Sequence, residues 1–220
     1  MVRLIDPYLK KLSALMSSMG EMSIRCISLA IDSYLKNKNY TKDVYELSNQ
    51  IKDKYFEVED LTFDILLRYQ PVADDFRFIR SSTEISYAFS RFGRYAYDIT
   101  LIRDLFGNIN ECKNSTLDKI SYKVKQIIKD AISSFSTLDI KKALVIRENE
   151  RFIDQIYRER LPMLIKSNNT KCALVEALIL RYLERIGDHA VFMSDAVNYI
   201  VTGKHRPTPN QISRYVENNL

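Results

Sequence analysis

Two pairs of carboxylates are the residues in this sequence whose types and spacing best fit a chemical site. Glu184 and Asp188 are four residues apart, and so are Glu150 and Asp154. On a helix this spacing places both acids of a pair on one face, about one turn apart, where like charges repel. If the two helices are antiparallel neighbours, the four carboxylates form the oxygen-rich pocket that divalent Mg, Mn or Fe prefers. A metal ion would neutralise the repulsion.

A plainer interpretation of the same acids is that they are surface residues neutralised by nearby arginines. Four arginines are interspersed with them: Arg147, Arg151, Arg181 and Arg185. Gly187 lies within the acidic pattern, and a glycine in mid-helix costs roughly 1 kcal/mol relative to alanine, which indicates close approach by another backbone or a ligand. Gly93 stands in a similar context. Packing of a neighbouring helix would explain both glycines without any ion.

The sequence gives little reason to expect a catalytic site. His189 directly follows Asp188, about 100° around the helix, and no Glu stands three residues before His189 or His205. The Glu-x-x-His element of di-iron oxidases is therefore absent. No nucleophile motif, glycine-rich phosphate loop or zinc spacing occurs either. We expect a protein that is not an enzyme.

The composition predicts a helical protein with a substantial core. Among 220 residues, 46% are hydrophobic and only five each are glycine and proline, which favours a few long helices. The N-terminus lacks the features of a secretory signal, and no run of 18 apolar residues occurs, so we expect a soluble, cytoplasmic protein. Three cysteines far apart in the chain (Cys26, Cys112 and Cys172) are expected to be buried free thiols rather than a disulfide framework or a thiolate metal site.

The formal net charge of +5 lies entirely in the second half of the chain. A run of lysines from Lys113 to Lys142 includes the pairs Lys119/Lys123 and Lys125/Lys129, each one helical turn apart. A solvated lysine face explains this stripe most simply. An acidic partner or anionic surface is the alternative.

Six amphipathic helices are predicted from apolar residues that recur every three or four positions. The first begins at Asp6-Pro7, with Asp6 as N-cap, and the sixth is closed by Gly203. Pro162 should kink or shorten the fifth helix. The other expected limits are Thr41 to Gln70, Ala73 to Gly107, a start near Thr116, Leu138 to Lys166 and Thr170 to Thr202.

The two halves of the chain repeat the same plan. Arg91-Phe92-Gly93 with Ala96 matches Arg185-Ile186-Gly187 with Ala190. Duplication explains this similarity, and the fold class expected is all-α, two tandem three-helix bundles. The domains expected are 1–110, 111–206 and a tail, 207–220, with a weak helical pattern through Ile212 and Val216.

Two strings of residues resemble the PhoU family of phosphate-uptake regulators. They are Leu183-Glu184-Arg185-Ile186-Gly187-Asp188-His189-Ala190, the more specific one, and Gln70-Pro71-Val72-Ala73-Asp74-Asp75-Phe76-Arg77-Phe78-Ile79. The resemblance extends over about residues 8 to 206 and agrees with the helix order above.

The resemblance implies an acid-x-x-x-Asp motif on the second and third helices of each bundle, holding a multinuclear divalent metal cluster. Iron is the metal expected, with Zn, Mn or Mg as alternatives. The second bundle matches with Glu150, Asp154, Glu184 and Asp188, and Asp195 is expected as an outer ligand. In the first bundle the matching positions are Ser48, Lys52, Ser90 and Arg94. We therefore expect metal in the C-terminal bundle only, and we expect Lys52 and Arg94 to pair with acids such as Asp53 or Asp98 in place of the ion.

In function, the resemblance implies a regulator that contacts the ATPase of the ABC-type phosphate transporter, and in some hosts a sensor kinase. Such a protein would reach the membrane only through its partner. A homodimer is compatible with it. Two alternatives stay open: a carboxylate-bridged metalloenzyme of the phosphohydrolase kind, and a metal-free helical adaptor. No direct contact with nucleic acid is expected, because no reading motif accompanies the lysine stripe.

Overall fold

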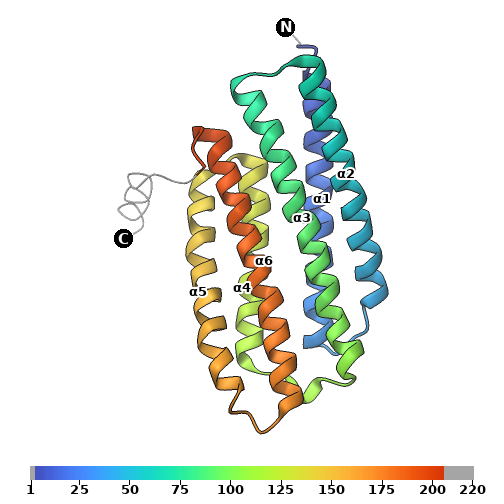
Figure 1. The fold of residues 1–220 in the computed structure, drawn as a ribbon, viewed down its shortest axis with the longest axis vertical. Helices are drawn as coiled ribbons and strands as arrows, with labels where there is room; N and C mark the ends of the chain where they lie inside the picture. The colour runs from blue at the N-terminus through green and yellow to red at the C-terminus, as the bar shows by residue number, and fades with distance from the viewer. Residues whose placement is uncertain (1–2, 206–220) are drawn as a thin grey trace.

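The computed structural model describes residues 3–205 and consists of six long helices with one short 3-10 helix (Figure 1). The elements are α1 (Asp6–Leu35), α2 (Thr41–Tyr69), α3 (Ala73–Phe106), η1 (Asn110–Cys112), α4 (Ser115–Thr137), α5 (Ile140–Leu164) and α6 (Thr170–Thr202). Residues 3–205 contain no strand, so the all-helical prediction is confirmed. The tail predicted at 207–220, with its helical pattern through Ile212 and Val216, lies outside the described residues.

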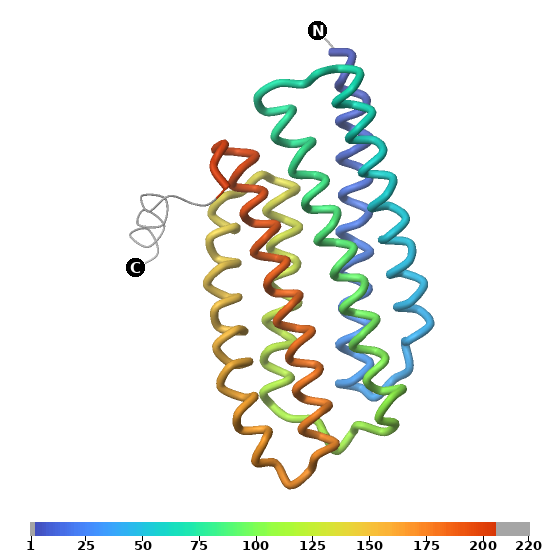
Figure 2. The backbone as a smooth tube through the Cα atoms, viewed as in Figure 1, coloured from blue at the N-terminus to red at the C-terminus, as the bar shows by residue number. Residues whose placement is uncertain are grey.

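The helices form two three-helix bundles that lie side by side along their length (Figure 2). α1, α2 and α3 form the first bundle, and α4, α5 and α6 form the second. α3 packs against α6 about as extensively as against α2, and α1 packs against α4. In both of these pairs the helices run antiparallel (Figure 1).

One continuous apolar core joins the two bundles. Phe89 and Phe92 of α3 and Ile186 of α6 are fully buried, as their three- and four-residue spacings predict. The α1–α4 contact is especially close at Gly20, where an added Cβ would lie 3.0 Å from the Ile132 side chain. A larger residue there would push the bundles apart.

The helix ends follow capping chemistry. The side chains of Asn114, Asp139 and Asn169 accept backbone N–H bonds at the starts of α4, α5 and α6. Gly203 adopts the left-handed conformation that closes α6, as predicted. The N-cap prediction for Asp6 is wrong, because Asp6 is the first helical residue and its carboxylate accepts the N–H of Arg3, 2.8 Å away.

Pro162 lies in the last turn of α5, which ends two residues later at Leu164. The helix is therefore shortened near the proline, as expected from the missing N–H. None of the helices in residues 3–205 is long and apolar enough to cross a membrane.

The cysteine prediction is wrong for two of the three thiols. Cys112 and Cys172 form a disulfide, with their Cα atoms 4.8 Å apart, although 60 residues separate them. The α4–α5 hairpin returns the chain to its starting point, so the N-terminus of α6 lies beside η1. Cys26 is a buried free thiol, as predicted, and burial raises its pKa to about 12.

Candidate functional site

The predicted acidic quartet lies between the two helices expected to carry it. Glu150 and Asp154 stand on α5, Glu184 and Asp188 stand on α6, and the two helices pack against each other. Glu184 is the most buried of the four, with a side chain only 10% exposed. The sequence therefore placed the four acids correctly on neighbouring helices.

The quartet is a site of unfavourable negative charge. Burial raises the pKa of Glu150, and the charges of Asp188, Asp154 and Glu184 raise it further. Burial also raises the pKa of Glu184 and of Asp188, and each is raised further by other members of the quartet. These raised pKa values mean that the folded protein disfavours the ionised acids, which a bound cation would reverse.

Three of the four acids have an arginine partner. Arg181 donates to Glu184 over 3.0 Å, Arg185 donates to Asp188 over 3.2 Å, and Arg158 donates to Asp154 over 3.0 Å. The plainer interpretation of the acids is thus partly confirmed, with Arg158 in place of Arg151 as a direct partner. Glu150 makes no ion pair or side-chain hydrogen bond within residues 3–205.

The donor set fits a divalent ion in its chemistry. All four candidate ligands are carboxylates and half-buried or buried, and the pKa values of Glu150, Glu184 and Asp188 are raised by burial and by neighbouring acids of the quartet. In residues 3–205, the one group of three acids, cysteines or histidines with ligand atoms within 4.8 Å of one another is Glu111, Cys112 and Cys172. Its two sulfur atoms are already bonded to each other. No three ligand atoms of the acidic quartet lie within 4.8 Å of one another.

Asp195 stands on α6 about two helical turns beyond Asp188. It pairs with Arg147 of α5, and both line a small cleft with Ile140, Leu144 and Asn198. The carboxylates that raise the pKa of Glu150 are the other three members of the quartet. The structure thus gives Asp195 an arginine partner, and its part as an outer ligand stays a prediction.

The two mid-helix glycines, Gly93 and Gly187, differ in how closely a neighbouring helix approaches them. A Cβ added at Gly93 would lie 3.2 Å from the Ser48 Cα, so α2 and α3 need glycine to approach this closely. A Cβ added at Gly187 would lie 3.6 Å from Glu150 Cγ, which is an ordinary contact. The prediction of close backbone approach is confirmed at Gly93 and wrong at Gly187.

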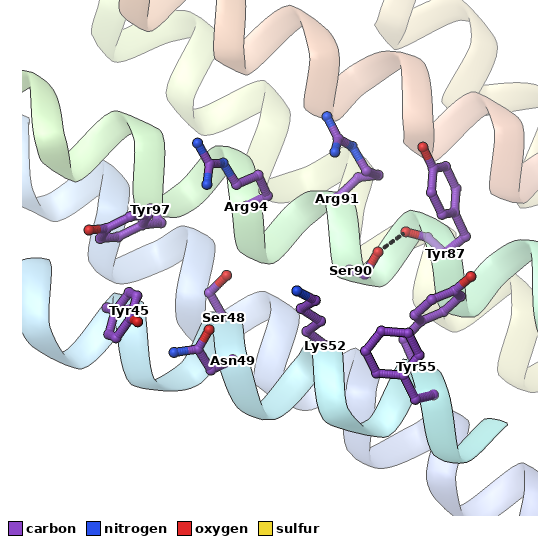
Figure 3. A pocket seen from close by; sticks show the side chains of 11 residues that line it. Tyr45, Ser48, Asn49, Lys52, Tyr55, Tyr87, Ser90, Arg91, Arg94 and Tyr97 are labelled. Carbon is purple, nitrogen blue, oxygen red and sulfur yellow. Dashed lines mark hydrogen bonds between the residues drawn. The ribbon is translucent and has the colours of Figure 1, made fainter. Parts of the chain in front are cut away.

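The first bundle holds a cavity at the position that matches the quartet (Figure 3). Its volume is about 270 Å³, and its lining includes the four positions that replace the acids: Ser48, Lys52, Ser90 and Arg94. Since Gly93 faces Ser48 as Gly187 faces Glu150, the sequence correctly matched α2 to α5. Asp53 does not line the cavity.

The ion pairs predicted for Arg94 and Lys52 are half confirmed, and the idea that these cations replace an ion stays a prediction. Arg94 forms a two-point ion pair with Asp98, through Nε at 3.1 Å and Nη2 at 3.0 Å. Lys52 forms no ion pair with Asp53 or with any other acid within residues 3–205, and its ammonium lies 6.0 Å from the centre of the Phe56 ring. Lys52 therefore carries a charge that the described protein does not neutralise.

Sequence reasoning missed the tyrosines of this cavity. Tyr45 and Tyr97 lie at one end, and Tyr55 and Tyr87 lie at the other (Figure 3). The signal was present, because Tyr45, Ser48, Lys52 and Tyr55 recur at three- and four-residue spacing along one face of α2.

His189 and the lysine stripe play structural parts. His189 is surrounded by the aromatic rings of Tyr87, Tyr95 and Phe192, and burial lowers its pKa to about 4.

Two lysines of the stripe contact the protein itself: Lys125 donates to Asp32 over 3.4 Å, and Lys123 donates to Asn149 over 3.0 Å. Lys142 donates to the Ser133 hydroxyl over 2.7 Å, so three of the seven lysines from Lys113 to Lys142 contact the protein itself.

Comparison with known proteins finds the PhoU domain twice, over residues 16–102 and 117–197. The phosphate-specific transport system accessory protein PhoU homolog 1 of Thermotoga maritima is 30% identical over an alignment of 190 residues that covers 77% of this chain and 76% of that protein. The PhoU homolog of Zymomonas mobilis is 25% identical over 94% of this chain and 90% of its own length. The crystal structure of PhoU from Pseudomonas aeruginosa superposes with a TM-score of 0.85 at 23% identity, covering 91% of this chain and all of that one.

Proposed function

The chain belongs to the PhoU family, and on this premise we propose that it regulates phosphate uptake by contact with the ABC-type phosphate transporter and binds divalent metal in its C-terminal bundle. The family match in both halves supports the role in phosphate transport. The relatives are named as accessory proteins of phosphate-specific transport, which supports a regulator rather than an enzyme. The ATPase of the transporter is the partner proposed, with a sensor kinase as a further one.

The observation that carries the metal proposal is the half-buried acidic quartet. Glu150 and Asp154 from α5 and Glu184 and Asp188 from α6 would hold the ion. A bound divalent ion supplies positive charge that offsets the mutual repulsion of these acids and ties α5 to α6. Iron is the first choice, with Zn, Mn or Mg as alternatives. The first bundle, with Lys52 and Arg94 at the matching positions, would hold none.

A cytoplasmic location belongs to the same proposal. The disulfide between Cys112 and Cys172 weighs against a cytoplasmic location, because reducing compartments keep cysteines as thiols. In the cytoplasm the two cysteines would be expected as a reduced pair.

The test is metal analysis of protein purified without chelator, beside the double variant Glu184→Gln/Asp188→Asn. We expect divalent metal in the wild-type protein and a loss of most of it in the variant. The Glu148→Gln variant, which removes an exposed acid from the same α5, is the control and should keep its metal. The partner contact is tested separately by binding of the purified transporter ATPase.

If wild-type protein holds no metal, the second candidate function applies, a metal-free helical adaptor. The arginine partners of Asp154, Glu184 and Asp188 favour it, because they already neutralise three of the four acids. In that case, ATPase binding would persist in the double variant.

A further inference from the structure

The cavity of the first bundle differs from the acidic quartet in charge as well as in shape. Its eleven lining residues include three cations, Lys52, Arg91 and Arg94, and no acid. Ser48 adds a hydroxyl donor and Asn49 adds an amide donor, whereas the Ser90 hydroxyl already donates to the Tyr87 carbonyl oxygen over 2.8 Å. Where the second bundle presents four negative charges, the first presents positive charge and hydrogen-bond donors.

Lys52 is the central donor of this cavity. Its side chain extends from α2 toward α3, between Ser48 and Ser90 (Figure 3). Within residues 3–205, the side chains of Lys52, Ser48 and Asn49 make no hydrogen bond or ion pair. These three donors of α2 therefore have no hydrogen-bond partner in the described residues, and they line the same cavity.

The two arginines lie on α3, with their guanidinium groups on the side nearer α6 (Figure 3). Arg94 uses Nε and Nη2 for Asp98, which leaves the N–H groups of Nη1 uncommitted. Arg91 donates through Nη2 to the hydroxyl of Tyr95 over 3.0 Å. Each guanidinium therefore keeps N–H groups that have no hydrogen-bond partner within residues 3–205.

Size and access narrow the class of ligand. A volume of about 270 Å³ lies just below the range of about 300–1,000 Å³ for drug-sized ligands, so the ligand is small. The cavity opens to solvent, since Tyr45 is 50% exposed and Tyr87 is 45% exposed. The ammonium, hydroxyl and amide donors of α2 around one small open space match the oxygens of a phosphate group, and the guanidinium groups of Arg91 and Arg94 add positive charge on the side nearer α6 (Figure 3). The tyrosine rings at both ends would accept a ring next to the phosphate.

We propose that the cavity between α2 and α3 binds the phosphate group of inorganic phosphate or a small phosphate ester, with Lys52 as its main charged contact. Two cations and two serines stand at the four positions that match the acidic quartet, so an anion site would lie where the second bundle has acids. This inference does not depend on metal in the second bundle.

Calorimetric titration of the full chain tests the proposal, with chelator in one series and divalent metal in a second. Inorganic phosphate and phenyl phosphate are separate probes at constant ionic strength. Wild-type protein should bind phosphate, and Lys52→Gln should weaken binding at least about tenfold, as for loss of a charged hydrogen bond. Lys42→Gln removes the same charge from an exposed position of α2 outside the cavity and should change nothing. Tighter binding of phenyl phosphate would identify an ester as the ligand, and equal binding would identify free phosphate.

A second variant makes the test independent of Lys52. Ser48→Glu introduces the residue that stands at the matching position of α5 and should abolish phosphate binding, with helix content checked by circular dichroism. Three results would overturn the proposal: no binding of either probe, equal weakening by Lys52→Gln and Lys42→Gln, or binding that requires divalent metal and disappears in Glu184→Gln. The last result would place the phosphate at the acidic quartet instead.

Discussion

Replacing Glu150 by glutamine should have opposite effects on stability in the absence and presence of metal. Glu150 is the best member of the quartet for this test, because it has no ion pair or side-chain hydrogen bond within residues 3–205 to lose. Its pKa is raised by burial and by the charges of Asp188, Asp154 and Glu184. At neutral pH the ionised side chain therefore destabilises the metal-free fold, and the uncharged amide removes that cost.

The magnitude follows from the number of like charges around Glu150. Each such contact at partial exposure costs about 0.2–0.5 kcal/mol, so three of them cost about 1 kcal/mol. In chelator, Glu150→Gln should therefore raise the Tm by about 2–4 °C for a chain of this length. Metal at one hundred times its Kd stabilises by about 2.7 kcal/mol. If losing a ligand weakens affinity about 100-fold, most of this disappears and the variant should melt about 3–5 °C below wild type.

The assay is thermal unfolding followed by circular dichroism, with chelator in one series and excess divalent metal in the other. Glu148→Gln, an exposed acid on the same helix, should leave the Tm unchanged in both series. A Glu150→Gln shift of the same sign and size in both series would refute the idea that the quartet binds metal. A lower Tm in chelator would refute the claim that its charge is unfavourable.

Three further predictions concern packing and crosslinks, each read by urea or thermal unfolding. Gly93→Ala should lower the free energy of unfolding by about 1–3 kcal/mol, because its Cβ meets the α2 backbone. Gly187→Ala should leave it unchanged or raise it by up to about 1 kcal/mol. Similar effects of the two substitutions would refute the packing difference. Cys112→Ser should lower the free energy of unfolding by up to about 4 kcal/mol under oxidising conditions and by little in reductant, since the crosslink closes a 60-residue loop. Equal stability of the variant and the wild type under oxidising conditions would contradict the disulfide. Arg94→Ala should lower the Tm by stranding a half-buried acid, while Lys52→Ala should not; equal effects would contradict the pairing observed.

The sequence predicted the helices and the acidic quartet well because both depend on local spacing. Apolar residues every three or four positions identify a helix, and acids four apart share a face wherever that helix lies. The ends marked by Gly203 and by the proline after Gln70 were also correct, since these residues act on their own backbone.

Features that depend on contacts between distant segments were missed. Nothing in the spacing of Cys112 and Cys172 reports that the α4–α5 hairpin returns the chain to its start. The Asp195–Arg147 pair joins α6 to α5 in the same way, so a family resemblance alone suggested a ligand there. The tyrosines at the two ends of the first-bundle cavity come from both α2 and α3, so they are recognised as a group only once the packing of these helices is known.

The contact between the two bundles has a symmetry that bears on how this chain arose. Each repeat contributes equivalent helices to it, α1 against α4 and α3 against α6, and both pairs are antiparallel (Figure 1). An interface in which equivalent elements meet each other is the kind that two identical half-length chains form around a two-fold axis. Two identical chains carry identical sites, so an ancestor of that kind could not hold acids in one half and cations in the other. Joining the halves into one polypeptide removed that constraint and let each site change its charge independently, while the shared core kept both in one folded unit.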